Sequence, residues 1–244
     1  MRGKTLDVLK SDKKAEHIVR LVMHLRKMGI TDDKVLGAIE RVPREIFIPQ
    51  VGNVIGQAYE DIALPIGRGQ TISQPYIVAF MTQALELNDR HRVLEVGTGS
   101  GYQACVLAWI CKRVYTIERH KPLLDEAAKI FAQLNIRDLH NITTKLGDGM
   151  RGWPEQAPFD RIIVTAAAAE KPPQALLDQL AVGGIMVIPV GRSGEQVLRR
   201  YKKESDDTFA VKDLLGVRFV PLLPDLARPT ENADDPANAE QTAF

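Results

Sequence analysis

From Arg92 onward, short apolar runs alternate with stretches of helical periodicity, and this alternation constrains the fold more than any other feature of the chain. Continuous apolar runs are typical of strands buried on both faces, and strands that alternate with helices pair in parallel. The sequence therefore predicts an α/β fold, a doubly wound sheet with helices on both faces. The expected strands are 92–96, 113–118, 141–146, 160–165 and 184–190, with helices near 102–111, 121–134 and 172–181.

The segments on either side of this core show other patterns. Before it, apolar residues recur at helical spacing over 18–28 and 35–42, and a third helix is expected after Pro75, so the core carries an N-terminal helical addition. Residues 44–73 are irregular and rich in glycine and proline, as functional loops often are. After the core, QVLRRYKKE and FAVKDLLG predict two antiparallel strands around a polar turn, and 217–222 is expected to form a last strand.

These segments predict one compact domain with a tail. Residues 1–90 are expected to pack, as helices and a long loop, against the α/β core of residues 91–227. Residues 228–244 lack periodicity and are rich in Ala, Asn, Asp and Pro, so we expect a disordered acidic tail. The tail has one basic and four acidic residues, which leaves a mildly positive body and a small bias toward anionic ligands.

Composition and missing motifs argue against several classes of function. A net charge of +1 gives no strongly basic surface, so no nucleic-acid partner is expected. The five histidines are scattered without HExxH, so no metal is expected, and no GxSxG supplies a hydrolase nucleophile. The N-terminus lacks an apolar signal core and no run reaches membrane-spanning length, so no membrane partner is expected. Cys105 and Cys111 lie in one apolar run and are expected to be small core residues. Because the sequence has no disulfide framework or CxxC pattern, a reducing, cytoplasmic compartment is expected.

A glycine-rich turn comes after the first expected strand, where a doubly wound fold places its ligand. The dinucleotide-binding pattern GxGxxG needs a glycine where Tyr102 stands. The spacing here is GxGxG preceded by Glu95, which suits S-adenosylmethionine (SAM), because SAM has no pyrophosphate. Taken alone, a GxGxG also occurs at ordinary tight turns between a strand and a helix. The turn consists of Gly97, Thr98, Gly99, Ser100 and Gly101.

Two further carboxylates come after the next two expected strands. Glu118 can accept hydrogen bonds from both ribose hydroxyls, which argues against a 2′-phosphorylated cofactor. Asp148 can accept a hydrogen bond from the adenine amino group. Taken singly, Glu118 could be a solvated strand end and Asp148 a turn former. Because the carboxyl ends of parallel strands open on one rim, the joint pattern predicts SAM binding by Glu95, Tyr102, Glu118, Arg119, Asp148, Gly149 and the glycine turn.

Motifs spread over residues 18–222 carry a resemblance to a known family. They are RVPREIFIP (41–49), AYEDIALPIGRGQTISQPYIVAFMTQAL (58–85), VLEVGTGSGYQA, GDGMRGWPEQAPFDRIIVTAAA (147–168), PPQALLDQL (172–180) and VRFVPL (217–222). The GxGxG and GDG pieces are shared by many methyltransferases, whereas GQTISQPYIVA joined to VTAAA and VRFVPL is much more specific. The chain resembles the protein-L-isoaspartate (D-aspartate) O-methyltransferases. This implies a Rossmann-like SAM-dependent methyltransferase fold whose strand order departs from the usual one at its C-terminal end.

The resemblance also implies an activity. Enzymes of this family transfer the SAM methyl group to the free α-carboxylate of L-isoaspartyl residues, and S-adenosyl-L-homocysteine is the second product. The methyl ester then collapses toward a succinimide, so the net effect is protein repair. The implied partners are damaged proteins or peptides that contain L-isoaspartate, and a monomer is favoured.

Ser73 is the residue that the family pattern marks as the active-site serine. Its hydroxyl is expected to orient the acceptor carboxylate rather than to act as a nucleophile. A serine two residues before a proline at a helix start is also a common N-cap, and both roles could coexist. Val217–Leu222 could pair with an extended peptide or could be a core edge strand. The expected substrate-binding residues are Thr71, Ile72, Gln74, Thr165, Ala166, Ala167 and Val220.

Two alternative functions remain open on the sequence alone. One is a SAM-dependent methyltransferase with another acceptor, such as a small molecule or RNA, although the chain lacks a basic, aromatic-rich pattern for RNA. The other is a SAM-binding module that has lost catalysis and acts as a sensor, against which the intact Ser73 motif argues.

Overall fold

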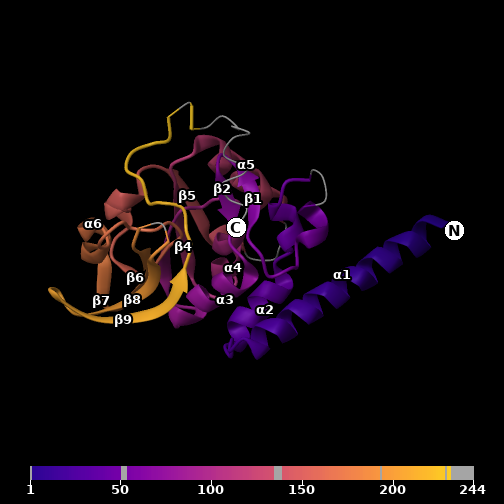
Figure 1. The fold of residues 1–244 in the computed structure, drawn as a ribbon, viewed down its shortest axis with the longest axis horizontal. Helices are drawn as coiled ribbons and strands as arrows, with labels where there is room; N and C mark the ends of the chain where they lie inside the picture. The colour runs from indigo at the N-terminus through magenta and orange to yellow at the C-terminus, as the bar shows by residue number, and fades with distance from the viewer. Residues whose placement is uncertain (1, 51–53, 135–138, 193, 229, 232–244) are drawn as a thin grey trace.

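The computed structural model describes residues 2–50, 54–134, 139–192, 194–228 and 230–231. Its centre is a seven-stranded sheet in the order β5-β4-β3-β6-β7-β8-β9 (Figure 1). Neighbouring strands from β5 to β7 are parallel, and β8 and β9 are added antiparallel at one edge. The strands are β3 (Arg92–Val96), β4 (Arg113–Glu118), β5 (Ile142–Leu146), β6 (Phe159–Val164), β7 (Leu180–Val190), β8 (Gln196–Ser205) and β9 (Thr208–Val217).

The parallel part of the sheet confirms the doubly wound α/β fold, because its central strands are buried on both faces. Val93 and Leu94 are neighbours in β3, point to opposite faces, and are both 0% exposed. Each belongs to a different hydrophobic cluster, one on each side of the sheet. The continuous apolar runs of the sequence are therefore the signature of two-sided burial.

Helices cover the two faces unequally. The cluster that contains Val93 takes in residues of α1 to α5, whereas the cluster that contains Leu94 takes in α6 and the segment around Trp153. The helices are α1 (Arg2–Lys27), α2 (Asp33–Arg41), α3 (Pro75–Ala84), α4 (Tyr102–Ala108), α5 (Lys121–Gln133) and α6 (Gln174–Asp178), with short 3₁₀ segments η1 (Arg44–Phe47), η2 (Val54–Gln57), η3 (Leu139–Asn141), η4 (Gly149–Arg151) and η5 (Pro154–Gln156).

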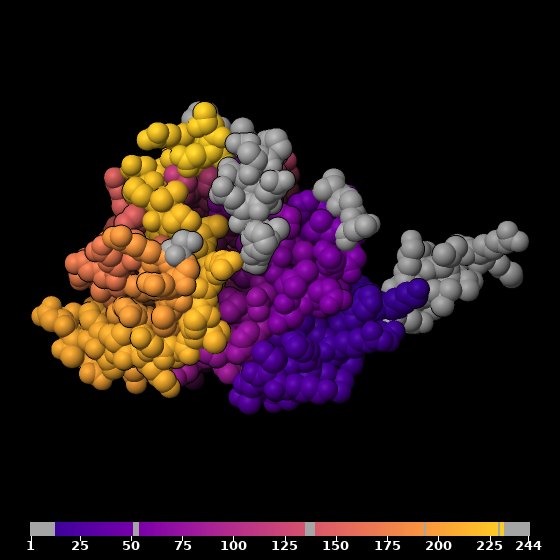
Figure 2. All heavy atoms as spheres, in the orientation of Figure 1, coloured from indigo at the N-terminus to yellow at the C-terminus, as the bar shows by residue number. Residues whose placement is uncertain are grey.

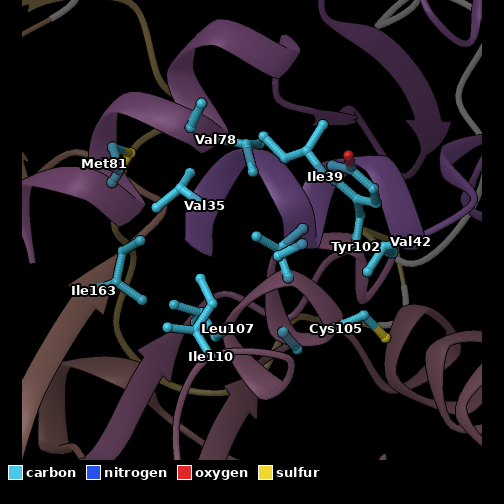
Figure 3. Close-up of a cluster of buried hydrophobic side chains, with 14 of the residues drawn as sticks. Val35, Ile39, Val42, Val78, Met81, Tyr102, Cys105, Leu107, Ile110 and Ile163 are labelled. Carbon is cyan, nitrogen blue, oxygen red and sulfur yellow. The ribbon is translucent and has the colours of Figure 1, made fainter. Parts of the chain in front are cut away.

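The N-terminal helices share their core with the sheet. Asp32 caps α2 by accepting hydrogen bonds from the backbone N–H groups of the first turn, and Val35 and Ile39 on the inner face of α2 are buried. Figure 3 shows these side chains together with Met81 of α3 and Ile163 of β6 in one cluster. The first half of α1 projects away from this body (Figure 1).

A small hairpin precedes α3. β1 (Leu64–Gly67) and β2 (Gln70–Ile72) pair antiparallel and form a two-stranded sheet of their own. The hairpin belongs to the stretch 44–73, for which the sequence predicted an irregular loop. It positions the Thr71–Gln74 segment, because β2 ends within that segment and α3 begins directly after it.

Two expectations about secondary structure need correction. The helix expected over 172–181 is only α6, because Leu180 already pairs with Phe159 as the first residue of β7. After a register shift, the pairing with β6 resumes at Ile185. The last strand expected over 217–222 does not form. There the chain makes one isolated bridge, between Pro221 and Ala167.

Two further outcomes concern the end of the chain. The antiparallel strands expected from QVLRRYKKE and FAVKDLLG are confirmed as β8 and β9, and β8 lies between β7 and β9. The resemblance implied a strand order that departs from the usual one at the C-terminal end, and the sequential order β7-β8-β9 is that departure. Most of the expected tail, 229 and 232–244, lies outside the described residues. In the part of the chain that the structure describes, no helix is long and apolar enough to cross a membrane.

Candidate functional site

A cavity of about 1370 Å³ opens beyond the carboxyl ends of β3, β4 and β6. β3 is the switch point of the sheet, since the chain continues from it to β4 on one side and later to β6 on the other, and ligands of doubly wound folds bind at such a point. One wall is the turn after β3, and another is the Thr71–Gln74 segment. Arg218–Leu222 also lines the cavity. On the face shown in Figure 2, the yellow C-terminal segment lies beside purple N-terminal residues.

The glycine turn after β3 is set by close packing. Gly97 has φ +97°, and a Cβ placed on it would lie 2.3 Å from Thr165 Oγ1. Thr165 Oγ1 is itself fixed, because it donates to the carbonyl oxygens of Val96 and Gly97. A side chain at Gly97 is therefore excluded by both backbone conformation and space. Of the predicted turn residues, Gly97, Thr98, Gly99 and Ser100 line the cavity together with Tyr102, while Gly101 lies behind them as the N-cap of α4.

The Glu118 carboxylate is buried at the cavity wall and organises the backbone around it. Oε2 accepts the Gly99 N–H at 2.9 Å, while Oε1 accepts the N–H groups of Arg119 at 2.8 Å and His120 at 2.9 Å. The side chain is thus no solvated strand end. A carboxylate offers about four acceptor positions, so the three backbone bonds leave one for a ligand, fewer than the two that the ribose hydroxyls would need.

Glu95 lies behind the cavity wall. It is 0% exposed and accepts a hydrogen bond from Thr116 Oγ1, which lies 2.6 Å from Thr98 Oγ1. Thr98 lines the cavity, so Glu95 reaches it only through this pair of hydroxyls. Burial raises the pKa of Glu95 to about 8, and the second oxygen of its carboxyl group has no hydrogen-bond partner among the described residues.

Asp148 also serves the local backbone. Its carboxylate accepts the Met150 N–H at 2.8 Å, which caps η4, and lies 3.3 Å from the Arg151 Nε atom. The neighbouring Gly149 lines the cavity, whereas Asp148 is not among the lining residues. In this structure the Asp148 side chain therefore acts as a turn former, which was the alternative to binding the adenine amino group.

Arg119 joins the cavity rim to the C-terminal segment. Its Nη1 atom lies 2.7 Å from a Glu231 carboxylate oxygen, and its backbone oxygen accepts the Ala227 N–H at 3.1 Å. Both Arg119 and Glu231 line the cavity. Sequence reasoning missed Glu231, because it is one acid among several in a stretch that predicted disorder.

The predicted acceptor segment lines the same cavity as the glycine turn. Thr71, Ile72, Ser73 and Gln74 all face the cavity. The N-cap position of α3 is Gln74, and no side-chain capping bond is made there. The hydroxyl of Ser73 is therefore not used as a helix cap, which was the competing interpretation.

Two residues that the sequence reasoning missed hold this segment. The buried Arg44 donates from Nη2 to the Ser73 carbonyl oxygen at 2.8 Å. Asp61 accepts the Tyr76 N–H, in the first turn of α3, at 2.7 Å. The signal was present in the RVPRE and AYED motifs, but a motif alone does not tell which of its side chains point inward.

The last predicted residues divide into two groups. Thr165, Ala166 and Val220 line the cavity. Ala167 does not, because its N–H donates to the Val220 carbonyl and its oxygen accepts the Leu222 N–H, both at 2.8 Å. Val217–Leu222 thus pairs with the protein itself on this side. No group of His, Cys, Asp and Glu side chains suited to a metal ion occurs among the residues described.

Comparison with known proteins gives a consistent picture. The family model for Protein-L-isoaspartate(D-aspartate) O-methyltransferase (PCMT) matches residues 16–226. A Protein-L-isoaspartate O-methyltransferase of Rhodospirillum centenum is 59% identical over 218 residues, which cover 88% of this chain and 96% of the relative. One of Paramagnetospirillum magneticum is 56% identical over 214 residues, covering 86% and 97%.

Solved structures agree with the sequence relatives. A protein-L-isoaspartate O-methyltransferase structure has a TM-score of 0.76 at 29% identity, over 86% of this chain and 67% of that chain. A Plasmodium falciparum structure described under the same enzyme name, in complex with S-adenosyl-L-homocysteine, has a TM-score of 0.71 at 26% identity, over 84% and 97%.

Proposed function

This chain belongs to the protein-L-isoaspartate (D-aspartate) O-methyltransferase family, and from that membership we propose that it methylates the free α-carboxylate of L-isoaspartyl residues in damaged proteins and peptides. It is a SAM-dependent methyltransferase. The observation that carries the acceptor assignment is the cavity itself, because the glycine turn after β3 and the Thr71–Gln74 segment face the same space.

The groups that line the cofactor end of the cavity suit the binding of SAM. The turn from Gly97 to Gly101 lets a ligand approach the backbone closely, and Glu118 keeps one acceptor position for a ribose hydroxyl. Gly149 and Tyr102 line the same space. When bound there, SAM supplies a methyl group already activated on a sulfonium sulfur. We assign Glu95 and Asp148 to holding this wall in shape, since neither lines the cavity.

The acceptor end has modest chemical demands. A carboxylate is ionised at neutral pH, so it attacks without help from a general base. The Ser73 hydroxyl donates to one carboxylate oxygen and leaves the other oxygen free to attack in line. Catalysis then consists of holding the acceptor in place and excluding water. Thr165, Ala166 and Val220 are assigned to the peptide backbone around the acceptor, and Ala167 supports Val220 from behind.

The test is methyl transfer from labelled SAM to two synthetic peptides that differ only in aspartate or isoaspartate at one position. The proposal expects base-labile label on the isoaspartyl peptide alone, because the product is a carboxyl methyl ester. No transfer to either peptide, with SAM binding intact by calorimetry, would redirect the assignment to another acceptor or to a binding protein without catalysis.

We further propose a monomeric cytoplasmic enzyme whose residues 1–90 and 91–227 form one compact domain. The large hydrophobic cluster supports the single domain, because it contains Leu25 of α1 and Val35 of α2 together with Val93 of β3. The two free, buried cysteines suit a reducing compartment. Size-exclusion chromatography with light scattering checks the monomer, and a dimer mass at micromolar concentration would refute it.

A further inference from the structure

The RVPRE motif contains a buried arginine that the proposed chemistry has not used. Arg44 begins η1, directly after Pro43, and is 0% exposed. Arginine is almost never fully buried unless it is paired, because removing its charge from water is costly. Yet none of the ion pairs among the described residues includes Arg44. Burial lowers its pKa to about 10, so the guanidinium stays charged at neutral pH without a carboxylate in direct contact.

The contacts of Arg44 join the two walls of the cavity. Nη2 donates to the Ser73 carbonyl at 2.8 Å and, more weakly, to the Ile62 carbonyl at 3.4 Å. The guanidinium carbon lies 5.0 Å from the centre of the Tyr102 ring, in cation–π geometry. Ser73 and Tyr102 both line the cavity, one on the acceptor wall and one at the start of α4 beside the glycine turn.

The Ser73 carbonyl depends on this donor. It lies just before the N-cap of α3, and the first helical backbone bond there runs from Val78 N to the Gln74 oxygen. Tyr76 lies three residues after Ser73, and its N–H donates to the Asp61 carboxylate. The negative charge of Asp61 also favours the charged form of Arg44. Arg44 and Asp61 thus hold the main chain on both sides of Gln74, which fixes the peptide plane between Ser73 and Gln74.

We propose that Arg44 is a positioning residue of the methyl-transfer site, which holds the Ser73 main chain so that the Ser73 hydroxyl meets the acceptor carboxylate. Tyr102 keeps the guanidinium against the start of α4, so the acceptor wall is set relative to the cofactor wall. This inference rests on the proposed role of Ser73. It requires a planar group that stacks and donates at once, which lysine does not provide.

The test compares Arg44→Lys with Arg41→Lys as the matched control. Arg41 lies in the same motif and also stacks on an aromatic ring, that of Trp109 at 5.6 Å, but it is exposed and does not contact the cavity. We expect Arg44→Lys to lower kcat for the isoaspartyl peptide by about 100-fold, since small misplacements cost that much, with the SAM Kd within about threefold. Arg41→Lys should leave both within about twofold. A wild-type kcat in Arg44→Lys overturns the inference.

A double-variant cycle separates positioning from general structural support. If Arg44 acts through Ser73, Arg44→Lys combined with Ser73→Ala loses little more activity than the worse single variant. Losses that multiply would show that Arg44 acts independently of Ser73, which also overturns the inference. A wild-type enzyme inactive on the isoaspartyl peptide would instead refute the proposed function and leave these contacts in place.

A neutral variant covers the case in which Arg44→Lys does not fold. Arg44→Gln keeps an N–H donor and buries no unpaired charge, so folding is easier to retain. With the circular dichroism and SAM Kd of the wild type, it should still show about a 100-fold lower kcat, because a short amide does not span the distance to the Ser73 carbonyl while stacking on Tyr102. Full activity in Arg44→Gln would contradict the inference as clearly as full activity in Arg44→Lys.

Discussion

The number of hydrogen bonds that the Glu118 carboxylate can still accept limits what this residue can do for a ligand. Its carboxylate already binds three backbone N–H groups, so it shapes the wall and keeps one position for a ligand. Glu118→Gln replaces one carboxylate oxygen, with its two acceptor positions, by an NH₂ group. The N–H donors of that group then face the backbone N–H donors that the oxygen bound. We expect SAM affinity to fall by about 10- to 100-fold, measured by calorimetry. An unchanged Kd would mean that the carboxylate has no part in the cofactor site.

Ser73 governs the acceptor rather than the cofactor. Ser73→Ala should lower kcat for the isoaspartyl peptide by about 10- to 100-fold, because one hydrogen bond to the reacting carboxylate is lost. The SAM Kd should stay within about twofold. Ser205→Ala, at the exposed end of β8, serves as the control. Unchanged turnover in Ser73→Ala would remove Ser73 from the site.

Glu95 makes stability depend on pH. Burial raises its pKa from 4.5 to about 8 in the folded state, so the folded protein binds this proton more tightly than the unfolded chain does. The stability contributed by this proton is present below about pH 4.5 and is lost as the pH rises through 8. Glu95→Gln should therefore flatten the decline in unfolding free energy between pH 5 and 8, by about 3 to 5 kcal/mol at most. Parallel pH profiles of denaturant unfolding for wild type and variant would contradict this.

At the scale of elements, the strand–turn–helix unit from β3 to α4 depends on the close approach of Gly97 to Thr165. Gly97→Ala meets a Cβ contact of 2.3 Å at φ +97°, so we expect a loss of about 2 to 4 kcal/mol in unfolding free energy and of SAM binding. Gly29→Ala is the matched control, because Gly29 has φ +95° and open space. It should cost only about 1 kcal/mol. Equal losses in thermal or urea unfolding would show that packing at Gly97 is unimportant.

At the scale of the whole molecule, the shared core predicts cooperative unfolding. Trp109 packs with the cluster that joins the N-terminal helices to the sheet, and Trp153 packs with the cluster on the other face. In each single-tryptophan variant, Trp109→Phe or Trp153→Phe, the urea transitions followed by fluorescence and by circular dichroism should coincide, because neither cluster exists without the sheet. Two separated midpoints would indicate that residues 1–90 unfold on their own.

Much of this protein was accessible from local sequence patterns. The runs 92–96 and 113–118 coincide with β3 and β4, since apolar continuity reports burial on both faces of a strand. The turn after β3 was recognisable because GxGxG is a local backbone requirement. The β8–β9 hairpin was also predicted from a local pattern, two segments that flank a polar turn. The sequence failed where the chain pairs with distant residues, as at Leu180 with Phe159 and Pro221 with Ala167.

By itself, then, the sequence determined the fold class, the glycine turn and the family, because each is written in local spacing or in contiguous motifs. Tertiary structure alone decided which polar groups of those motifs are left for ligands. Glu95 bonds the Thr116 hydroxyl behind the wall, Asp148 bonds the Met150 backbone, and Glu118 keeps one free acceptor position. Arg44 reaches the Ser73 carbonyl across the fold. The physical reason is that a buried polar group must find partners, and its partners come from chain segments that only folding brings together.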